Sequence, residues 1–205
     1  MERADLIAVN GRYYITAGGL GLPCAVVHIA DVIRYRRRWG KTVHGMLKSN
    51  LYLLAALYAL LRTAPDENPT ELRWDDRSVA RDPLLLMINN QESVGGNFQI
   101  SPGAINDDGR FDVCLIEGLK NRARSVATLL RALKGTHIDQ PFVKSWRARE
   151  LDIRADRPVR FLADGEILES NTEFRIRIAP RALKVIAPGA AKSAPAKAGL
   201  NGGVP

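Results

Sequence analysis

The sequence is poor in cysteine and histidine, the residue types that form disulfides and most often bind zinc. It contains two cysteines, Cys24 and Cys114, and three histidines. The cysteines lie far apart in apolar surroundings without CxxC spacing, and the histidines show no metal-ligand spacing. These scarcities argue against a disulfide framework and a zinc site, and we expect a protein of the reducing cytoplasm.

Long hydrophobic runs and several familiar motifs are also missing. The longest apolar run, LYLLAALYALL at residues 51–61, is too short to cross a bilayer. The N-terminal stretch MERADLIAVNGRYY lacks the charged-then-apolar pattern of a signal peptide. Neither a GxSxG elbow nor a GxxxxGK[ST] phosphate loop occurs. We therefore expect a soluble chain without a GxSxG nucleophile or a GxxxxGK[ST] phosphate-binding loop.

Acidic residues are outnumbered, since 30 Lys and Arg face 22 Asp and Glu and the formal net charge is +8. This balance favours acidic partners such as an anionic membrane surface, phosphorylated substrates or nucleic acid. The run RYRRRWGK at residues 34–41 suits anionic lipid, and it equally suits the solvated C-terminal end of a helix. Nucleic-acid binding rests on net charge alone, so we expect no nucleic-acid partner.

Apolar periodicity predicts both helices and strands. Helical spacing begins at residue 25 and leads into the basic run, and it recurs at about residues 44–62 and 123–134. Strand patterns cover residues 12–16, 70–76, 83–89, 110–118 and several segments from 149 onward. The predicted fold class is α+β, an antiparallel β-sandwich-like domain with two N-terminal helices and one inserted helix. It spans residues 1–188, and residues 189–205, rich in Ala, Pro, Gly and Lys, form a disordered tail.

Two glycine-containing stretches leave two interpretations open. AGGLGLP at residues 17–23 follows a strand and precedes a helix, so its backbone could face phosphate, although a tight turn is favoured. SPGAINDDGRFDV at residues 101–113 has the Asp-Gly signal of a hairpin turn. The same tight loop could also turn backbone carbonyls toward a carboxylate, which is the oxygen shell that Mg²⁺ accepts.

A second acidic stretch, FLADGEILES, ends a strand with Asp164-Gly165-Glu166. It reads as another hairpin turn. A carboxylate at a rigid strand end can also accept the proton of a hydroxyl that attacks a phosphoryl group, with a companion acid orienting it or holding Mg²⁺.

In chain order these pieces resemble one family. The segments PLLLMINNQESVGGNFQISPGAINDDGRFDVCLIEG, RFLADGEIL and FRIRIAPRALKVIAP resemble the C-terminal domain of the soluble diacylglycerol kinase family, which is related to sphingosine and ceramide kinases. GRYYITAGGLGLPCAVV is similar to the opening of that domain. The resemblance covers residues 10–188 and implies a fold like that of the C-terminal domain of NAD-kinase-like lipid kinases.

The resemblance also implies chemistry. It implies an ATP-dependent lipid kinase of phospholipid biosynthesis, with Glu166 as proton acceptor and Asp164 beside it. It places a structural Mg²⁺ on Asp108 and the main-chain oxygens of Ile105 and Arg110. The family's Gly-Gly-Asp-Gly-Thr phosphate loop does not occur in this sequence, so we expect the N-terminal nucleotide-binding domain to be absent.

Two hypotheses follow. The chain is the C-terminal part of a lipid kinase acting on a diacylglycerol-like lipid, truncated or completed by a separate nucleotide-binding chain, located in the cytoplasm or peripherally at the inner membrane surface. Alternatively, it is a non-catalytic basic module that binds acidic lipid or a membrane surface through residues 36–41 and the apolar faces of its first two helices.

Overall fold

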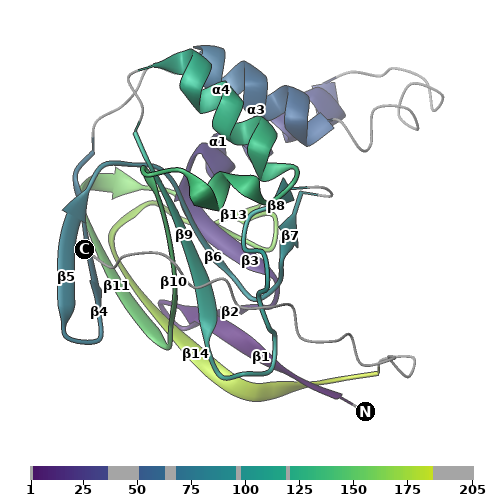
Figure 1. Ribbon diagram of the computed structural model, residues 1–205. Helices are drawn as coiled ribbons and strands as arrows, with labels where there is room; N and C mark the ends of the chain where they lie inside the picture. The colour runs from purple at the N-terminus through teal and green to yellow at the C-terminus, as the bar shows by residue number, and fades with distance from the viewer. Residues whose placement is uncertain (1, 37–50, 63–67, 96–97, 119–120, 187–205) are drawn as a thin grey trace.

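The computed structural model describes residues 2–36, 51–62, 68–95, 98–118 and 121–186. Two six-stranded sheets face each other, and three helices lie together on the outer side of one of them (Figure 1). All of the strand pairs in the described residues are antiparallel. The predicted α+β class with a β-sandwich-like domain is confirmed.

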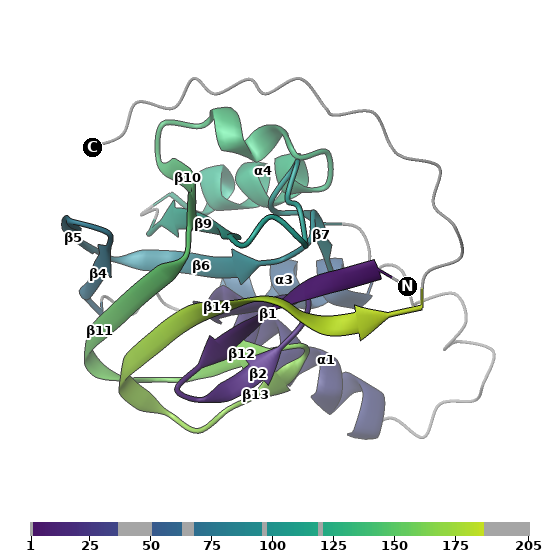
Figure 2. The same ribbon diagram turned by 90° about the horizontal axis from the view of Figure 1, so that it is seen from below.

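The first sheet, called sheet A, carries the long C-terminal strand across the molecule beside β1 and β11 (Figure 2). Its strands in spatial order are β2 (Arg12–Tyr14), β1 (Glu2–Val9), β14 (Asn171–Val185), β11 (Glu150–Val159), β4 (Thr70–Trp74) and β5 (Arg77–Arg81). The outer face of sheet A alternates Arg with Asp and Glu, as in the Arg154–Glu173 and Arg177–Asp152 ion pairs. This face is therefore the solvated side of the sandwich.

The second sheet, called sheet B, lies between sheet A and the helices. Its strands in spatial order are β10 (Val143–Ala148), β9 (Phe111–Glu117), β6 (Pro83–Asn89), β3 (Ala17–Gly21), β12 (Phe161–Ala163) and β13 (Glu166–Ile167). A two-stranded ribbon, β7 (Ser93–Val94) with β8 (Phe98–Gln99), follows β6.

Sheet B is apolar on both faces because each face has its own cover. Leu86 and Ile88 of β6 belong to the core between the sheets, whereas Leu85 and Met87 belong to the cluster under the helices. Successive side chains of a strand point to opposite faces of the sheet. When both faces are buried, every position is apolar and the sequence shows a continuous apolar run. The run at residues 83–89 was predicted as a strand, and β6 has those bounds.

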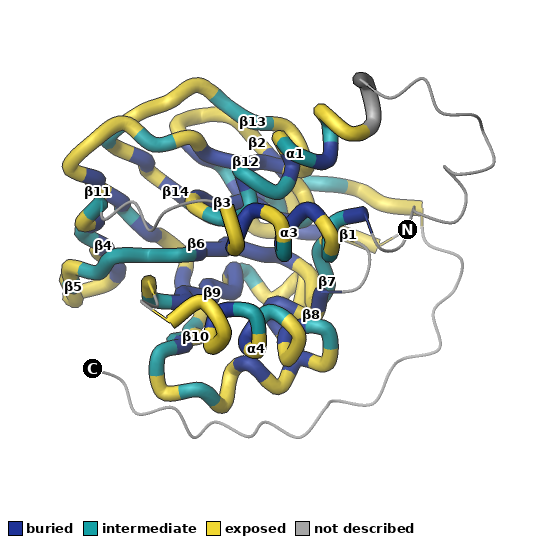
Figure 3. Tube along the Cα trace, turned by 90° about the horizontal axis from the view of Figure 1, so that it is seen from above, coloured by how far each residue is buried: buried dark blue, intermediate teal, exposed yellow. Residues whose placement is uncertain are grey.

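The described residues form three α-helices, and two of them pack together through small residues. They are α1 (Leu22–Arg36), α3 (Leu51–Arg62) and α4 (Arg122–Ala132), followed by the 3₁₀ helix η1 (Thr136–Asp139). Ala55 of α3 packs against Ala30 of α1 in a small buried cluster, and the opposite side of α3 is exposed (Figure 3). The Asn121 carboxamide caps α4 by accepting the N–H of Arg124 at 3.2 Å. Among the described helices, none combines the length and the apolar character that crossing a bilayer requires.

The glycine-rich stretch is a strand and not a turn. Gly18, Gly19 and Gly21 belong to β3, which pairs with β6 on one side and β12 on the other. A Cβ on Gly19 would lie 2.1 Å from the carbonyl oxygen of Leu86, so the neighbouring backbone leaves no room for a side chain. The glycines therefore serve the close approach of strands, and the expected turn was wrong.

Candidate functional site

A row of polar side chains crosses sheet B where its helix cover ends. Ala17 pairs with Asn89, Asn89 with Asp112 and Asp112 with Arg147 on four successive strands. Residues opposite one another in antiparallel strands share a face, and Asn89 lies two residues from Met87 of the helix-side cluster. The row therefore lies on the helix side. Asp164 lies next to Ala17, because the Asp164 N–H donates to the Ala17 carbonyl oxygen at 2.9 Å.

The Asp164-Gly165 pair forms a two-residue hairpin turn between β12 and β13. Both residues have positive φ angles, +46° and +88°, and Ala163 pairs with Glu166 across the turn. Two successive positive φ angles are typical of the type I′ hairpin, for which Asp-Gly is a preferred sequence. The hairpin predicted from these residues is confirmed.

The Asp164 carboxylate is held at the corner where β2 leads into β3. It accepts the N–H of Ile15 at 2.7 Å, the N–H of Thr16 at 2.8 Å and the Thr16 hydroxyl at 2.5 Å. Partial burial would raise the pKa of Asp164, but these hydrogen bonds outweigh it and hold the pKa below its usual value. Asp164 is thus an ionised carboxylate whose oxygens are engaged by backbone, which suits a residue that positions the turn.

Glu166 follows this turn as the first residue of β13. Its side chain is exposed, and β13 is the edge strand of sheet B. Asp164 and Glu166 belong to the same hairpin, but their two carboxylates have different surroundings. Asp164 accepts hydrogen bonds from Ile15 and Thr16, whereas the Glu166 side chain is exposed. Glu166 as proton acceptor stays a prediction.

An apolar cavity of about 290 Å³ lies beneath the helices and reaches the Asp164-Gly165 turn. Its wall is built from sheet B, α1, α3, α4 and the β7–β8 ribbon. The lining includes Val26, Tyr52, Met87, Phe98 and Leu129, with Thr16, Asp164 and Gly165 at its polar end. Reasoning from the sequence did not find this cavity, because its wall comes from segments that only the packing of the helices brings together.

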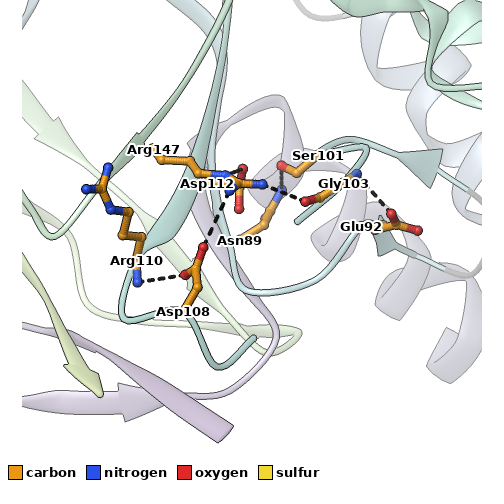
Figure 4. A network of polar contacts seen from close by, with 8 residues as sticks. All are labelled: Asn89, Glu92, Ser101, Gly103, Asp108, Arg110, Asp112 and Arg147. Carbon is orange, nitrogen blue, oxygen red and sulfur yellow. Dashed lines mark hydrogen bonds and ion pairs between the residues drawn. The ribbon is translucent and has the colours of Figure 1, made fainter. Parts of the chain in front are cut away.

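The 101–110 loop lies at the other end of the polar row (Figure 4). The Asp108 Oδ1 atom accepts the N–H of Arg110 at 2.9 Å, and Asp108 Oδ2 lies 3.5 Å from Arg147 Nη1. The next residue, Gly109, has a φ of +73°, but the predicted hairpin is wrong, because β9 pairs with β6 and β10 and the preceding β8 pairs with β7. The Gly109 N–H donates to the buried carboxylate of Asp5 in β1 at 2.7 Å, which ties the loop to sheet A.

Asp112 carries a second carboxylate in this region. Burial raises the pKa of Asp112, the Arg147 guanidinium opposes this by attraction, and the nearby Asp108 carboxylate adds to the rise. The Arg147 Nε atom lies 3.2 Å from Asp112 Oδ1. Arg147 was not singled out from the sequence, where it is one polar residue in a short alternating segment.

The predicted magnesium ligands can be tested against this arrangement. Asp108 is in the loop as predicted, together with Ile105 and Arg110, whose main-chain oxygens were the other expected ligands. The Arg147 guanidinium lies 3.5 Å from Asp108 Oδ2, so in this arrangement that carboxylate oxygen already faces a positive charge. The described residues contain no group of three or more His, Cys, Asp and Glu side chains that could hold a metal ion. Mg²⁺ at Asp108 stays a prediction.

Two further predicted features have different outcomes. The side chains of the basic run at residues 34–41 lie outside the described residues. His137 is fully buried, with Nε2 at 3.2 Å from the carbonyl oxygen of Ile100 and 3.7 Å from Cys114 Sγ, whereas His28 is exposed. The Nδ1 atom of His137 is buried without a hydrogen-bond partner.

Comparisons with known proteins agree with this geometry. Residues 34–187 match the family described as "YegS C-terminal NAD kinase beta sandwich-like domain". The chain is 24% identical to the diacylglycerol kinase of Bacillus subtilis over 164 residues, which are 79% of the chain and 50% of that protein. It is 29% identical to the protein of Escherichia coli O1:K1 named "Probable lipid kinase YegS" over 133 residues, 65% of the chain and 42% of the relative.

A crystal structure of a diacylglycerol kinase from Bacillus anthracis str. Sterne shows the same fold. It matches with a TM-score of 0.55 at 14% identity and covers 88% of this chain and 52% of that one. The chain thus spans about half the length of the curated relatives it matches, or less.

We predict that Asp164 makes stability depend on pH. Because its folded-state pKa is lowered, its contribution is complete above about pH 5 and is lost as the pH falls through that pKa. Asp164→Asn should reduce the free energy of unfolding by about 1 kcal/mol at neutral pH, a low value because the side chain is exposed. Urea unfolding between pH 3 and 7, measured on parent and variant, should show the two curves converging at acid pH. A constant difference would contradict the prediction.

Proposed function

Since the chain belongs to the YegS C-terminal NAD kinase beta sandwich-like domain family, we propose that it is the lipid-binding and proton-accepting part of an ATP-dependent lipid kinase of diacylglycerol kinase type. One observation carries the proposal. The apolar cavity ends at the Asp164-Gly165 turn, and Glu166 is the next residue. An apolar chain in the cavity would therefore bring a hydroxyl at its end to the Asp164-Gly165 turn, one residue from the exposed Glu166, which does not itself line the cavity.

The complete reaction needs parts beyond this chain. The Gly-Gly-Asp-Gly-Thr phosphate loop does not occur in the sequence, and the match covers about half of the relatives' length. We propose that ATP is bound by a nucleotide-binding domain outside this sequence, on a separate chain or in the remainder of a longer protein, and that the 1–188 domain supplies the lipid. Mg²⁺, where the complete enzyme uses it, would neutralise phosphate charge as in other kinases.

The proposed step is transfer of the ATP γ-phosphoryl group to a lipid hydroxyl. The hydroxyl oxygen forms a bond to the γ-phosphorus, the bond from that phosphorus to the bridging oxygen breaks, and ADP leaves with the bonding electron pair. The hydroxyl proton passes to the Glu166 carboxylate. Asp164 holds the hairpin that carries Glu166, and Glu166 directly follows the turn that reaches the cavity. The apolar wall orients the lipid chain and excludes water from its length.

We predict that Glu166→Gln abolishes phosphoryl transfer while leaving the fold intact. The amide cannot accept the proton, and general base catalysis contributes about 10²- to 10⁴-fold. The measurement is ³²P transfer from ATP to diacylglycerol in mixed micelles, with a family nucleotide-binding domain added to the chain.

The matched control is Glu169→Gln, another exposed carboxylate beyond β13. It should transfer phosphate as the parent does. Parent activity in Glu166→Gln, with an unchanged melting temperature, would rule out Glu166 as the proton acceptor. Turnover by the chain without an added nucleotide-binding domain would rule out the proposal that ATP is bound outside this sequence.

We predict that filling the cavity prevents lipid binding. Val26 of α1 lines the cavity, and Phe in its place would occupy the volume that an acyl chain needs. Binding of a fluorescent diacylglycerol analogue to Val26→Phe should weaken by about tenfold or more, measured by titration. The matched control is Val32→Phe on the same helix, because Val32 is 39% exposed and does not line the cavity. Equal affinities of the two variants would contradict the cavity as the lipid site.

A second candidate function is docking at an anionic membrane surface, and the outer side of the helix layer favours it. Leu54, Tyr58 and Leu61 are each about half exposed on one side of α3. Neither α3 nor α4 contains an acidic residue, and Arg62, Arg122, Arg124 and Arg131 belong to these two helices. Apolar side chains flanked by cations are typical of interfacial helices.

We predict that Leu54→Gln/Leu61→Gln reduces binding to vesicles of phosphatidylcholine and phosphatidylglycerol by about tenfold, because each change removes apolar contact with the bilayer. Co-sedimentation at low and high salt is the measurement. The control is Tyr13→Gln/Val185→Gln, which removes exposed apolar side chains from sheet A. If both double variants bind as the parent does, net charge alone explains binding and the docking role of α3 is wrong.

A further inference from the structure

One side chain from the edge of sheet B holds the 101–110 loop. Arg147 of β10 uses its three guanidinium nitrogens on three different partners (Figure 4). Nη2 donates to the carbonyl oxygen of Gly103 at 2.7 Å, Nε lies 3.2 Å from Asp112 Oδ1, and Nη1 lies 3.5 Å from Asp108 Oδ2. The three contacts join the start of the loop, its turn and the strand that follows it.

These partners are the ligand types that a hard cation prefers. Two carboxylates and one backbone carbonyl present oxygen atoms from three points of the loop to a single positive charge. Asn89, which pairs with Asp112 on the neighbouring strand, donates its amide to Ser101 Oγ at 2.8 Å. Its Oδ1 atom is buried and has no hydrogen-bond partner. The neighbouring residue thus has a buried amide oxygen to which no donor is bound.

We propose that the Arg147 guanidinium occupies the place of a divalent cation in this loop, so that the loop is braced without metal. Removing that side chain would open a cation site made of the Asp108 and Asp112 carboxylates and the Gly103 carbonyl. This arrangement goes beyond the proposed lipid kinase function and does not depend on it.

The shape of the guanidinium accounts for its place here. Arginine presents five N–H donors in a planar fork, whereas a lysine ammonium is a compact point charge. Only the fork can reach two carboxylates and a carbonyl that lie at different positions around it. Asp112 is buried, so leaving its carboxylate without a positive partner is costly. Removal of Arg147 therefore creates a demand for another cation.

The test is thermal unfolding of the full chain in excess EDTA and in millimolar Mg²⁺ or Ca²⁺. The parent should melt at the same temperature in all three conditions. Arg147→Ala should melt about 4–8 °C lower in EDTA, and either metal ion should raise its melting temperature by about 2–4 °C. Arg147→Lys should lie between the two, because it keeps the charge and loses the fork. In Arg147→Ala/Asp108→Ala the metal effect should disappear.

Arg73→Ala is the matched control, since Arg73 forms an exposed ion pair with Glu71 on β4 at 2.7 Å. It should melt within about 1 °C of the parent, and neither metal ion should change its melting temperature. The proposal would be overturned if Mg²⁺ raised the melting temperature of the parent but not that of Asp108→Ala. This comparison does not require any Arg147 variant to fold. An Arg147→Ala protein that melts like the parent, or that ignores both metal ions, would overturn the proposal as well. None of these readouts involves lipid or ATP.

Discussion

Burial of sheet B on both faces is the constraint on which the rest of the structure depends. Its inner face packs on sheet A, and its outer face cannot be left in water because Leu85, Met87, Cys114 and Ile116 project from it. The helices supply that cover, and the sandwich and the helix layer are therefore one packing unit. The cavity lies between the same helices and the same strands, so the part of the chain that stabilises the fold also shapes the proposed lipid site.

The polar row marks the limit of that cover. Toward the end of the strands, apolar residues give way to Asn89, Asp112 and Arg147, and the Asp164 turn lies at the opposite side. Each carboxylate of the row is neutralised in its own way. Asp164 is met by backbone N–H groups and Asp112 by a guanidinium. Glu166 is the exposed residue just beyond this row, and we propose that it is the proton acceptor.

Elements with a clear local signal could be predicted. β6 followed from an apolar run, α4 from its spacing, and the Asp164-Gly165 hairpin from its turn residues. β3 was misread because glycines carry no side-chain pattern, so a central strand looked like a turn. β10 was missed because its six residues alternate polar and apolar without a distinctive composition. Arg147 was missed with it, since nothing in the local sequence distinguishes an arginine that braces a loop from one in solvent.

The sequence by itself determined the class of fold, the family, the Asp164-Gly165 turn and the placement of Glu166 directly after it. These properties depend on neighbours in the chain or on an ordered set of motifs, both of which can be read along the chain. The tertiary structure alone decided that Asp164 is engaged by the backbone at Ile15 and Thr16, that a cavity ends at that turn, and that Arg147 lies on Asp108. Each of these contacts joins segments far apart in sequence, and strand register and helix packing determine which of them meet.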